Sequence, residues 1–299
     1  MTGIICINKP KDITSFGVVA KARGILGERK AGHTGTLDPM ATGVLPIMLG
    51  GATKFLNYLP ESDKGYRAVF LLGKTTDTLD ITGNILSESN VTATKQDIER
   101  ILPRYTGKIM QIPPMYSAKS VDGTRLYDLA RKGVEIQREA CEIEIKKLEI
   151  ISFDPDKKEC TIDVLCSKGT YIRSLIDDIG KDLGCGAVMT ELQRTNAMGF
   201  GLERCVTIDE LQTRKDSGKG FDDIVLSVEE LFGNYEKVFV SPAQSTRFAN
   251  GGALDLNRIK KDIKSNTIYR VYSCENIFLG LGKAKDDELK VLRLLSKRD

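Results

Sequence analysis

The segment Gly32 to Ile47, which reads GHTGTLDPMATGVLPI, carries the residues best suited to chemistry. It holds the single histidine of the chain, His33, and one carboxylate, Asp38, among residues that bear no other charge. Gly and Pro in such density serve backbone geometry, because Gly reaches dihedrals closed to other residues and Pro fixes its own. A lone Asp in this frame is either a turn residue bonded to its own backbone or a catalytic acid.

The composition is that of an ordinary globular chain and excludes several classes of function. The 299 residues are enough for two domains, and 41% are hydrophobic and 28% charged. No apolar run is long enough to span a membrane, and the N-terminus lacks an export signal. Seven cysteines without a Cys-x-x-Cys pair predict reduced thiols in a cytoplasmic protein. With one histidine and no nucleotide-binding loop, we expect neither a metal nor a cofactor.

Basic residues are concentrated toward both ends of the chain. Residues 1–60 carry a net charge of +4 and residues 240–299 carry +5, whereas residues 201–235 carry −4. Basic ends suit a protein that binds a phosphate backbone at two places. Ordinary surface charge explains excesses of this size equally well.

The segment around Asp38 resembles the catalytic motif of the TruB family, the tRNA pseudouridine-55 synthases. That motif reads Gly-His-x-Gly-x-Leu-Asp-Pro-x-Ala-x-Gly-x-Leu, and every fixed position is met between Gly32 and Leu45. A match of this length is far more specific than a short glycine motif. Further stretches resemble the family in order and spacing up to about Val228: NKPKDITS, KGYRAVFLLG, QIPPMYSAKSVDGTRLYDLARKG, KGTYIRSLIDDIG and LQRTNAMGF.

The resemblance implies a stand-alone, cofactor-free isomerase that converts uridine 55 in the T-arm of tRNA to pseudouridine. Such an enzyme flips the target base out of the stack, detaches uracil from its ribose and rejoins it through carbon 5. One ionised carboxylate is the essential group, and Asp38 occupies its position. Whether Asp38 attacks carbon 6 of the ring or carbon 1 of the ribose, or removes a sugar proton, stays open. The implied partner is tRNA, bound by a monomer without protein partners.

Two more residues are expected to be catalytic. A buried carboxylate stays ionised only beside a fixed cation, and the resemblance assigns that cation to Arg173. The alternative is a solvated Arg at the start of the following helix. Tyr66 stands where the family has the tyrosine that stacks on the target uracil, although a core tyrosine is the usual explanation for a Tyr in a strand.

Four residues are expected to bind substrate or RNA. His33 has an ordinary pKa that suits a general base, but no Ser-His or Cys-His pattern is visible, so we assign it to holding or displacing bases. Tyr171, Leu192 and Arg194 are expected at the pocket. Lys9 and Pro10 are expected to brace the segment of Asp38. The sequence departs from the family pattern at Asp12, Gln193, Asn196 and Met198.

Interspersed strand and helix patterns predict an α+β fold around a mixed or antiparallel sheet. The expected strands are Gly3 to Asn8, Lys64 to Gly73, the hairpin Glu142 to Ser152 with Glu159 to Ser167, and near the end Ile268 to Tyr272 and Ile277 to Leu281. The expected helices are Ser15 to Leu26 with Ser15 as N-cap, Thr94 to Arg104 with Thr94 as N-cap, and Ser174 to Leu183. Arg214 to Asp223 is expected to be an exposed loop.

The chain is predicted to form two domains. A pseudouridine-synthase catalytic domain is expected over residues 1–233 and a small β-rich, PUA-like RNA-binding domain over residues 236–299. The boundary is placed in Phe232 to Glu236. In the resembling family, residues 113–138 would form an insertion that clamps the RNA arm; without the resemblance, a surface excursion of no special role is the simpler explanation.

Three other functions compete with the one that the resemblance implies. A guide-RNA-dependent synthase of the same superfamily shares the Asp motif but works inside a ribonucleoprotein. A non-catalytic tRNA-binding or tRNA-folding protein would use only the basic surfaces and the C-terminal module. A hydrolase using Asp38 and His33 would lack a metal or nucleophile partner.

Overall fold

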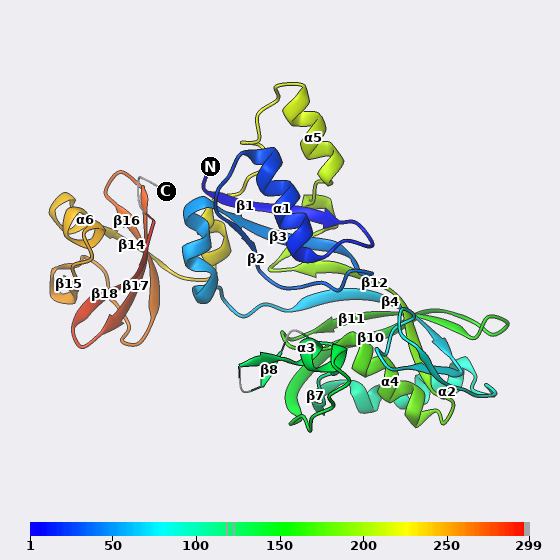
Figure 1. Ribbon diagram of the computed structural model, residues 1–299. Coiled ribbons are helices and arrows are strands. Elements are labelled where there is room, and N and C mark those ends of the chain that lie inside the picture. The colour runs from blue at the N-terminus through cyan, green and yellow to red at the C-terminus, as the bar shows by residue number, and fades with distance from the viewer. Residues whose placement is uncertain (118, 122, 296–299) are drawn as a thin grey trace.

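The chain folds around two separate sheets (Figure 1). The computed structural model describes residues 1–117, 119–121 and 123–295, so parts of the expected insertion (118, 122) and of the expected C-terminal domain (296–299) lie outside the described residues. The nine-stranded sheet has the main order β1-β3-β12-β4-β11-β10-β7, with β2 paired to β3 and β13 to β12. The five-stranded sheet has the order β14-β16-β17-β18-β15. The predicted α+β class with a β-rich C-terminal part is confirmed.

The bounds of the elements are as follows. The large sheet contains β1 (Gly3–Lys9), β2 (Ala31–His33), β3 (Thr42–Leu49), β4 (Lys64–Leu72), β7 (Gly107–Gln111), β10 (Cys141–Asp154), β11 (Glu159–Cys166), β12 (Ala187–Ala197) and β13 (Phe200–Gly201). The small sheet contains β14 (Lys237–Val240), β15 (Leu254–Asp255), β16 (Ile268–Ser273), β17 (Phe278–Lys285) and β18 (Glu288–Leu294). Two short hairpins are β5 (Lys74–Thr76) with β6 (Ile85–Glu88) and β8 (Ser120–Val121) with β9 (Thr124–Arg125). The helices are α1 (Ser15–Leu26), α2 (Lys95–Ile101), α3 (Leu126–Arg131), α4 (Ile172–Asp182), α5 (Ile208–Asp216) and α6 (Pro242–Ala249), with 3-10 turns η1 (Gly50–Tyr58), η2 (Leu102–Tyr105), η3 (Leu202–Arg204), η4 (Val228–Phe232) and η5 (Leu256–Arg258).

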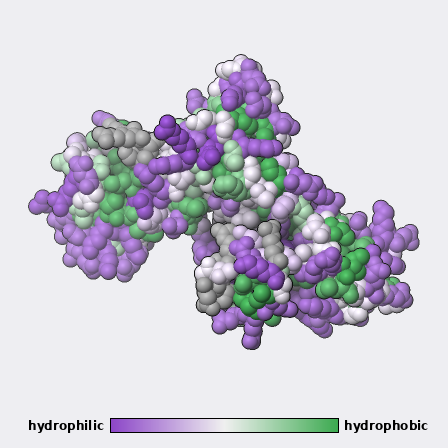
Figure 2. All heavy atoms as spheres, in the orientation of Figure 1, coloured by the Kyte–Doolittle hydropathy of each residue, from purple (hydrophilic) through white to green (hydrophobic). Residues whose placement is uncertain are grey.

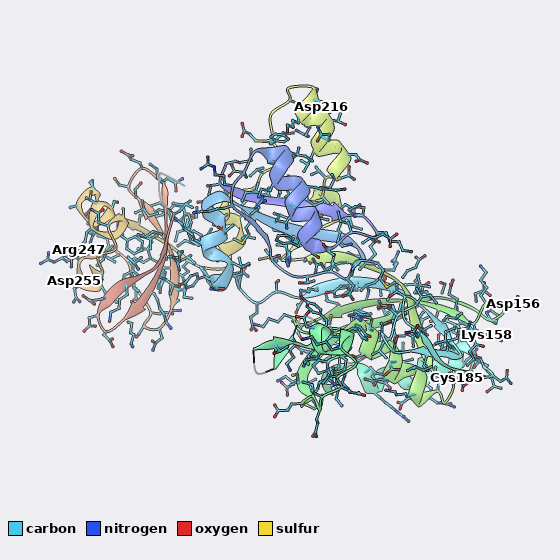
Figure 3. All side chains as sticks on the ribbon, viewed as in Figure 1. Asp156, Lys158, Cys185, Asp216, Arg247 and Asp255 are labelled. Atoms are coloured by element: carbon cyan, nitrogen blue, oxygen red, sulfur yellow. The ribbon has the colours of Figure 1, made fainter. Side chains whose placement is uncertain are left out.

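The hairpin of β10 and β11 shows how the residue pattern dictates the sheet. In β11 the side chains of Cys160, Ile162 and Val164 are buried, and those between them are partly exposed. Successive side chains of a strand point to opposite faces, so a strand with one face on the core shows this alternation. Asp156 and Lys158 mark the tip of the hairpin, at the end of the molecule farthest from the small sheet (Figure 3).

Helices cover the large sheet through apolar faces. Val18 and Val19 of α1 and Leu211 of α5 pack with Ile5 of β1 and Ile47 of β3. Helix α4 packs on β12 at Gly180, where any Cβ would collide with the backbone of Ala187, so only glycine allows this approach. The close packing sets the position of the first turn of α4, which carries Arg173.

Helix α1 corrects one prediction. Its N-cap is Thr14, whose side chain accepts a hydrogen bond from the amide of Gly17, and not Ser15. Ser15 lies inside the first turn and is buried. Gly27 ends the helix with a φ of 69°, as expected of a glycine C-cap.

Two other predicted ends also differ. Thr94 caps α2 in a capping box with Asp97, as predicted, but the α-helix ends at Ile101 and continues as a 3-10 turn. The predicted loop from Arg214 is helical up to Asp216, because a capping box begins α5 upstream at Thr207. None of the helices in the described part of the chain combines the length and apolar character needed to cross a membrane.

The two sheets meet through an apolar contact. The ring centroid of Phe55 in η1 lies 5.8 Å from that of Phe232 and 6.2 Å from that of Phe278. Ile4 of β1 and Leu281 of β17 belong to the same buried cluster. Phe232 lies inside the expected boundary segment, but it packs in the apolar cluster that joins the two sheets and is therefore not part of a free linker. The domain ranges stay a prediction.

Candidate active site

Asp38 lies in the loop of residues 34–41 between β2 and β3, here called the Asp38 loop. The buried side chain of Lys9 holds this loop in place. Lys9 Nζ donates to the carbonyl oxygens of Pro39 at 2.9 Å, Ala41 at 2.6 Å and Pro10 at 2.9 Å. The ammonium therefore satisfies main-chain acceptors directly after Asp38. The predicted bracing role of Lys9 is confirmed.

The start of α1 holds the same loop from a second side. Ser15 Oγ lies 2.8 Å from the amide and 3.0 Å from the carbonyl oxygen of Leu37. The amide of Asp12 donates to the carbonyl oxygen of Pro39 at 2.8 Å. Asp12 replaces a family glycine and has a φ of 63°, in the left-handed region that Asp tolerates better than most residues. Asp12 thus adopts, in place of the family glycine, a backbone conformation that glycine favours.

Arg194 of β12 holds the loop from a third side. Its guanidinium donates to the carbonyl oxygens of Val44 at 2.7 Å, Gly35 at 3.1 Å and Thr36 at 3.4 Å. The side chain is fully buried. Gly43 permits this contact, since its φ is 101° and any Cβ would collide with the backbone of Arg194. Arg194 was expected to bind substrate; in the structure its guanidinium is engaged by these backbone carbonyl oxygens and by the side chain of Tyr66.

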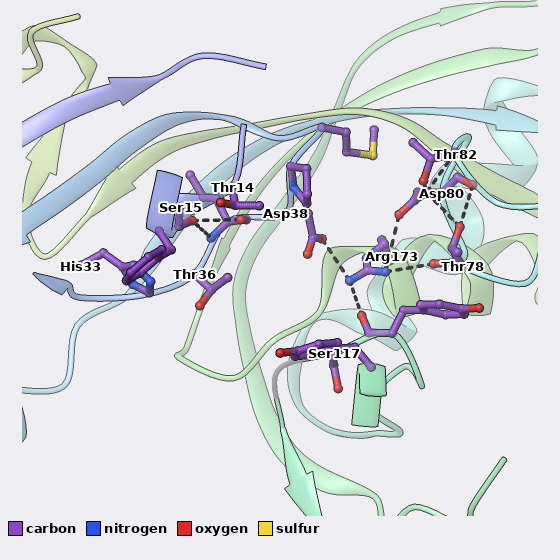
Figure 4. Close-up of a pocket in the computed structure, with 16 residues that line it drawn as sticks. Thr14, Ser15, His33, Thr36, Asp38, Thr78, Asp80, Thr82, Ser117 and Arg173 are labelled. Atoms are coloured by element: carbon purple, nitrogen blue, oxygen red, sulfur yellow. Dashed lines mark hydrogen bonds and ion pairs between the residues drawn. The ribbon is translucent and has the colours of Figure 1, made fainter. Parts of the chain in front are cut away.

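Arg173 forms an ion pair with Asp38 at the centre of the site (Figure 4). Arg173 Nη2 lies 3.0 Å from Asp38 Oδ2, and the Asp38 side chain is 34% exposed. Burial raises the pKa of the Asp38 carboxyl, and the neighbouring Asp80 adds to this, while Arg173 and Lys9 act in the opposite direction. The structure brings Asp38 and Arg173 together, as the resemblance implies.

Asp80 is a second carboxylate on Arg173 that sequence reasoning missed. Its Oδ2 lies 3.5 Å from Arg173 Nη1, and its side chain is 7% exposed. Asp80 Oδ1 accepts from the hydroxyl of Thr78 at 2.9 Å and the amide of Thr82 at 3.0 Å. The only signal in the sequence was the polar stretch TTDTLDIT, in which four Thr surround two Asp. Arg173 also donates to the carbonyl oxygens of Thr78 at 3.0 Å and Tyr116 at 2.8 Å, which leaves it little freedom to move.

Asp38 lies at the seam between two cavities. The Tyr66 cavity, of about 210 Å³, is lined by Tyr66, Tyr171, Leu192 and Lys64 among others. The Phe16 cavity, of about 490 Å³, is lined by Phe16, His33, Asp80, Tyr116 and Tyr127 among others. Five residues line both: Thr36, Leu37, Asp38, Ser117 and Arg173. The Tyr66 cavity thus unites five of the seven predicted site residues, while His33 faces the other cavity and Arg194 lines neither.

The two tyrosines of the Tyr66 cavity are rigidly placed. Tyr66 is 7% exposed, and burial raises its pKa to about 12, so its hydroxyl is protonated at neutral pH. The backbone of Tyr171 is held by Gln111, whose side chain accepts from the amide at 2.8 Å and donates to the carbonyl oxygen at 3.0 Å. Buried Gln111 is a further support that the sequence analysis did not identify.

His33 is placed for contact and not for proton transfer. Burial and the nearby Arg194 lower its pKa, so the imidazole is neutral at pH 7. Its Nδ1 is buried and has no hydrogen-bond partner among the described residues. Within the same residues, no group of three or more His, Cys, Asp or Glu is arranged to hold a metal ion.

Replacing Lys9 by methionine should lower the free energy of unfolding by about 2–4 kcal/mol, because buried main-chain acceptors would lose a charged donor. Urea denaturation of the purified variant measures this. The control is Lys11→Met, an exposed lysine nearby, which should change stability by less than about 0.5 kcal/mol. Equal stability of both variants would show that the ammonium does not hold the Asp38 loop.

Comparison with known proteins covers almost the entire chain. Three family models match: TruB family pseudouridylate synthase (N terminal domain) over residues 23–172, tRNA pseudouridylate synthase B C-terminal domain over 173–232, and Pseudouridine synthase II TruB, C-terminal, over 237–295. The chain is 40% identical to tRNA pseudouridine synthase B of Clostridium acetobutylicum, covering 99% of this chain and 100% of that one. It is 43% identical to the protein of that name from Clostridium novyi, with the same coverage. Among solved structures, a Cbf5–Nop10–Gar1 complex matches with a TM-score of 0.74 at 26% identity, over 98% of this chain and 84% of that one.

Proposed function

The chain belongs to the TruB family of pseudouridylate synthases, and on this basis we propose that it converts uridine 55 in the T-arm of tRNA to pseudouridine. The observation that carries the proposal is the ion pair of Asp38 and Arg173 in the wall of the Tyr66 cavity. An isomerisation of this kind needs one ionised carboxylate and a pocket for the detached base, without redox change. The site supplies both.

The proposed roles follow from where each side chain lies. Asp38 is the catalytic carboxylate, and Arg173 keeps it ionised against the effect of burial. The uracil occupies the Tyr66 cavity, stacked on Tyr66 and enclosed by Tyr171 and Leu192. A cavity of about 210 Å³ suits a single pyrimidine ring more closely than a whole nucleotide.

Two of the expected site residues support the reaction from outside the Tyr66 cavity. His33 faces the Phe16 cavity, where a neutral ring can take the place of a base that leaves the stack. Arg194 is a positioning residue for the Asp38 loop, because its guanidinium already donates to the loop's carbonyl oxygens of Gly35 and Thr36. This revises its expected role as a direct substrate contact.

Cations without carboxylate partners mark where the RNA backbone would pass. Lys64 lines the Tyr66 cavity, and in the part of the chain that the structure describes no ion pair engages its ammonium. On the small sheet, Lys237 Nζ lies 4.6 Å from the ring centre of Tyr272. Hydrophilic side chains cover the outer edge of the part of the molecule that contains the small sheet (Figure 2, left). The proposed PUA-like domain over residues 236–299 and the proposed clamp over residues 113–138 would hold the arm from two sides.

Relatives favour the stand-alone enzyme over the guide-dependent alternative. Identity to the bacterial tRNA pseudouridine synthases is 40–43% over their full length, against 26% to the chain of the Cbf5 complex. The proposal therefore includes a monomer that needs tRNA as its only macromolecular partner and acts in the cytoplasm.

The test is tritium release from a T-arm hairpin labelled at carbon 5 of its uridines, with the purified chain alone. Release from the hairpin, but not from one with cytidine at position 55, is expected. Tight binding without release would support the non-catalytic alternative. Activity that appears only with a guide RNA and partner proteins would support the guide-dependent one.

A further inference from the structure

Ser117 carries a buried hydroxyl that has no hydrogen-bond partner among the described residues. The residue is 5% exposed, and its Oγ is unpaired. Its backbone is fixed, since the amide donates to the carbonyl oxygen of Met115 at 2.9 Å and the carbonyl accepts from the amide of Tyr127 at 3.1 Å. The preceding carbonyl, of Tyr116, accepts from Arg173. A buried unpaired hydroxyl is unfavourable, and in a cavity wall it indicates a missing ligand contact.

The position of Ser117 restricts what that ligand group can be. Ser117 lines both cavities, as Asp38 does, and Figure 4 shows it on the side of Arg173 away from Asp80. If the uracil fills the Tyr66 cavity and Asp38 reaches the glycosidic region, the ribose must occupy the seam. This holds for each of the three possible actions of Asp38, because carbon 6 of the ring and carbon 1 of the sugar are bonded to the same nitrogen, and a sugar proton lies on the ribose itself.

The charges at the seam favour a neutral partner. Asp38 lines both cavities together with Ser117, and Arg173 is shared between Asp38 and Asp80, so a phosphate at the seam would meet negative charge that one guanidinium does not compensate. A serine hydroxyl is both donor and acceptor, and so is the ribose 2′-hydroxyl. Lys64, which also lines the Tyr66 cavity, is the better partner for a phosphate.

We propose that the Ser117 hydroxyl hydrogen-bonds to the 2′-hydroxyl of the target nucleotide and so favours ribose over deoxyribose at this position. The proposal rests on the proposed function, because it requires the uracil in the Tyr66 cavity. By this proposal Ser117, which belongs to the expected insertion over residues 113–138, contacts the substrate directly.

A double-mutant cycle tests it. Single-turnover rates are measured for wild type and Ser117→Ala on two T-arm hairpins, with uridine or 2′-deoxyuridine at position 55. Ser117→Ala should slow the ribose substrate about tenfold and leave the deoxyribose substrate within about twofold of wild type. Any intrinsic effect of the missing 2′-hydroxyl on the chemistry is the same for both proteins and cancels. Dissociation constants of both hairpins, measured in an Asp38→Asn background, give the same cycle without turnover.

The controls separate the ways in which the idea can fail. Ser245→Ala in α6 removes another hydroxyl without a partner among the described residues, far from both cavities, and should change no rate. Equal slowing of both substrates by Ser117→Ala, with no coupling in the dissociation constants, overturns the 2′-hydroxyl contact. So does an unchanged rate on the ribose substrate. Wild type that binds the hairpin but releases no tritium would instead overturn the proposed function.

Discussion

Asp38→Asn is expected to lower the rate of pseudouridine formation by about 10⁴-fold or more, because an amide can be neither the nucleophile nor the base. The side chain keeps its size, so the dissociation constant for the T-arm hairpin should stay within about threefold of wild type. Tritium release and filter binding measure the two quantities on the same preparation. Substantial turnover by this variant would remove Asp38 from catalysis.

The same variant should retain the stability of the fold. Burial raises the pKa of the Asp38 carboxyl, so the folded chain holds the ionised form at an energetic cost. Arg173 would still be paired with Asp80 after the substitution. Urea denaturation should therefore place Asp38→Asn within about 1 kcal/mol of wild type, which excludes unfolding as the reason for lost activity.

Arg173→Met is expected to slow the reaction by roughly 10²–10³-fold at pH 7 and to shift its pH dependence. Burial and Asp80 would then raise the pKa of Asp38 without an opposing guanidinium. The reaction needs the ionised carboxylate, so its rate rises as the pH rises through this pKa, and a higher pKa moves that rise to higher pH. A pH–rate profile under single-turnover conditions measures the shift.

A stability measurement and two comparison variants define this result. Arg173→Met should also destabilise the fold by about 3–5 kcal/mol, because buried Asp80 and partly exposed Asp38 lose their cation, so rates must be measured where the variant is folded. Arg173→Lys keeps the charge but cannot bridge both carboxylates, and should be intermediate. Arg67→Met removes an exposed ion pair with Asp163 and should affect neither rate nor profile. An unchanged profile for Arg173→Met would contradict the proposed role of the guanidinium.

Local patterns in the sequence were sufficient for much of the fold. The alternation in β11 and the periodicity of α4 predicted real elements, because burial of one face depends on residue spacing alone. Helix ends were less reliable. Both Thr14 and Ser15 are good caps; in the fold Thr14 accepts from the amide of Gly17, while the Ser15 hydroxyl is engaged by the backbone of Leu37.

The residues of the site also fall into two groups, those that the sequence identified and those that it did not. A long motif singled out Asp38, and the resemblance added Arg173 and Tyr66, since each lies in a contiguous stretch that matches the family. Asp80 lies outside these stretches, and Gln111 begins one of them but was not singled out within it. Their importance comes from contacts with Arg173 and Tyr171, which are far away in the chain.

What the sequence by itself determined is therefore the identity of the chemical group and the elements around it. The tertiary structure decided which way the supporting side chains face. Arg194 turns toward the Asp38 loop because β12 meets β3 at Gly43. Ser117, whose hydroxyl has no partner among the described residues, lies at the seam because Arg173 holds the carbonyl before it. Neither orientation follows from residue type or spacing, because each depends on hydrogen bonds between segments that only folding brings together.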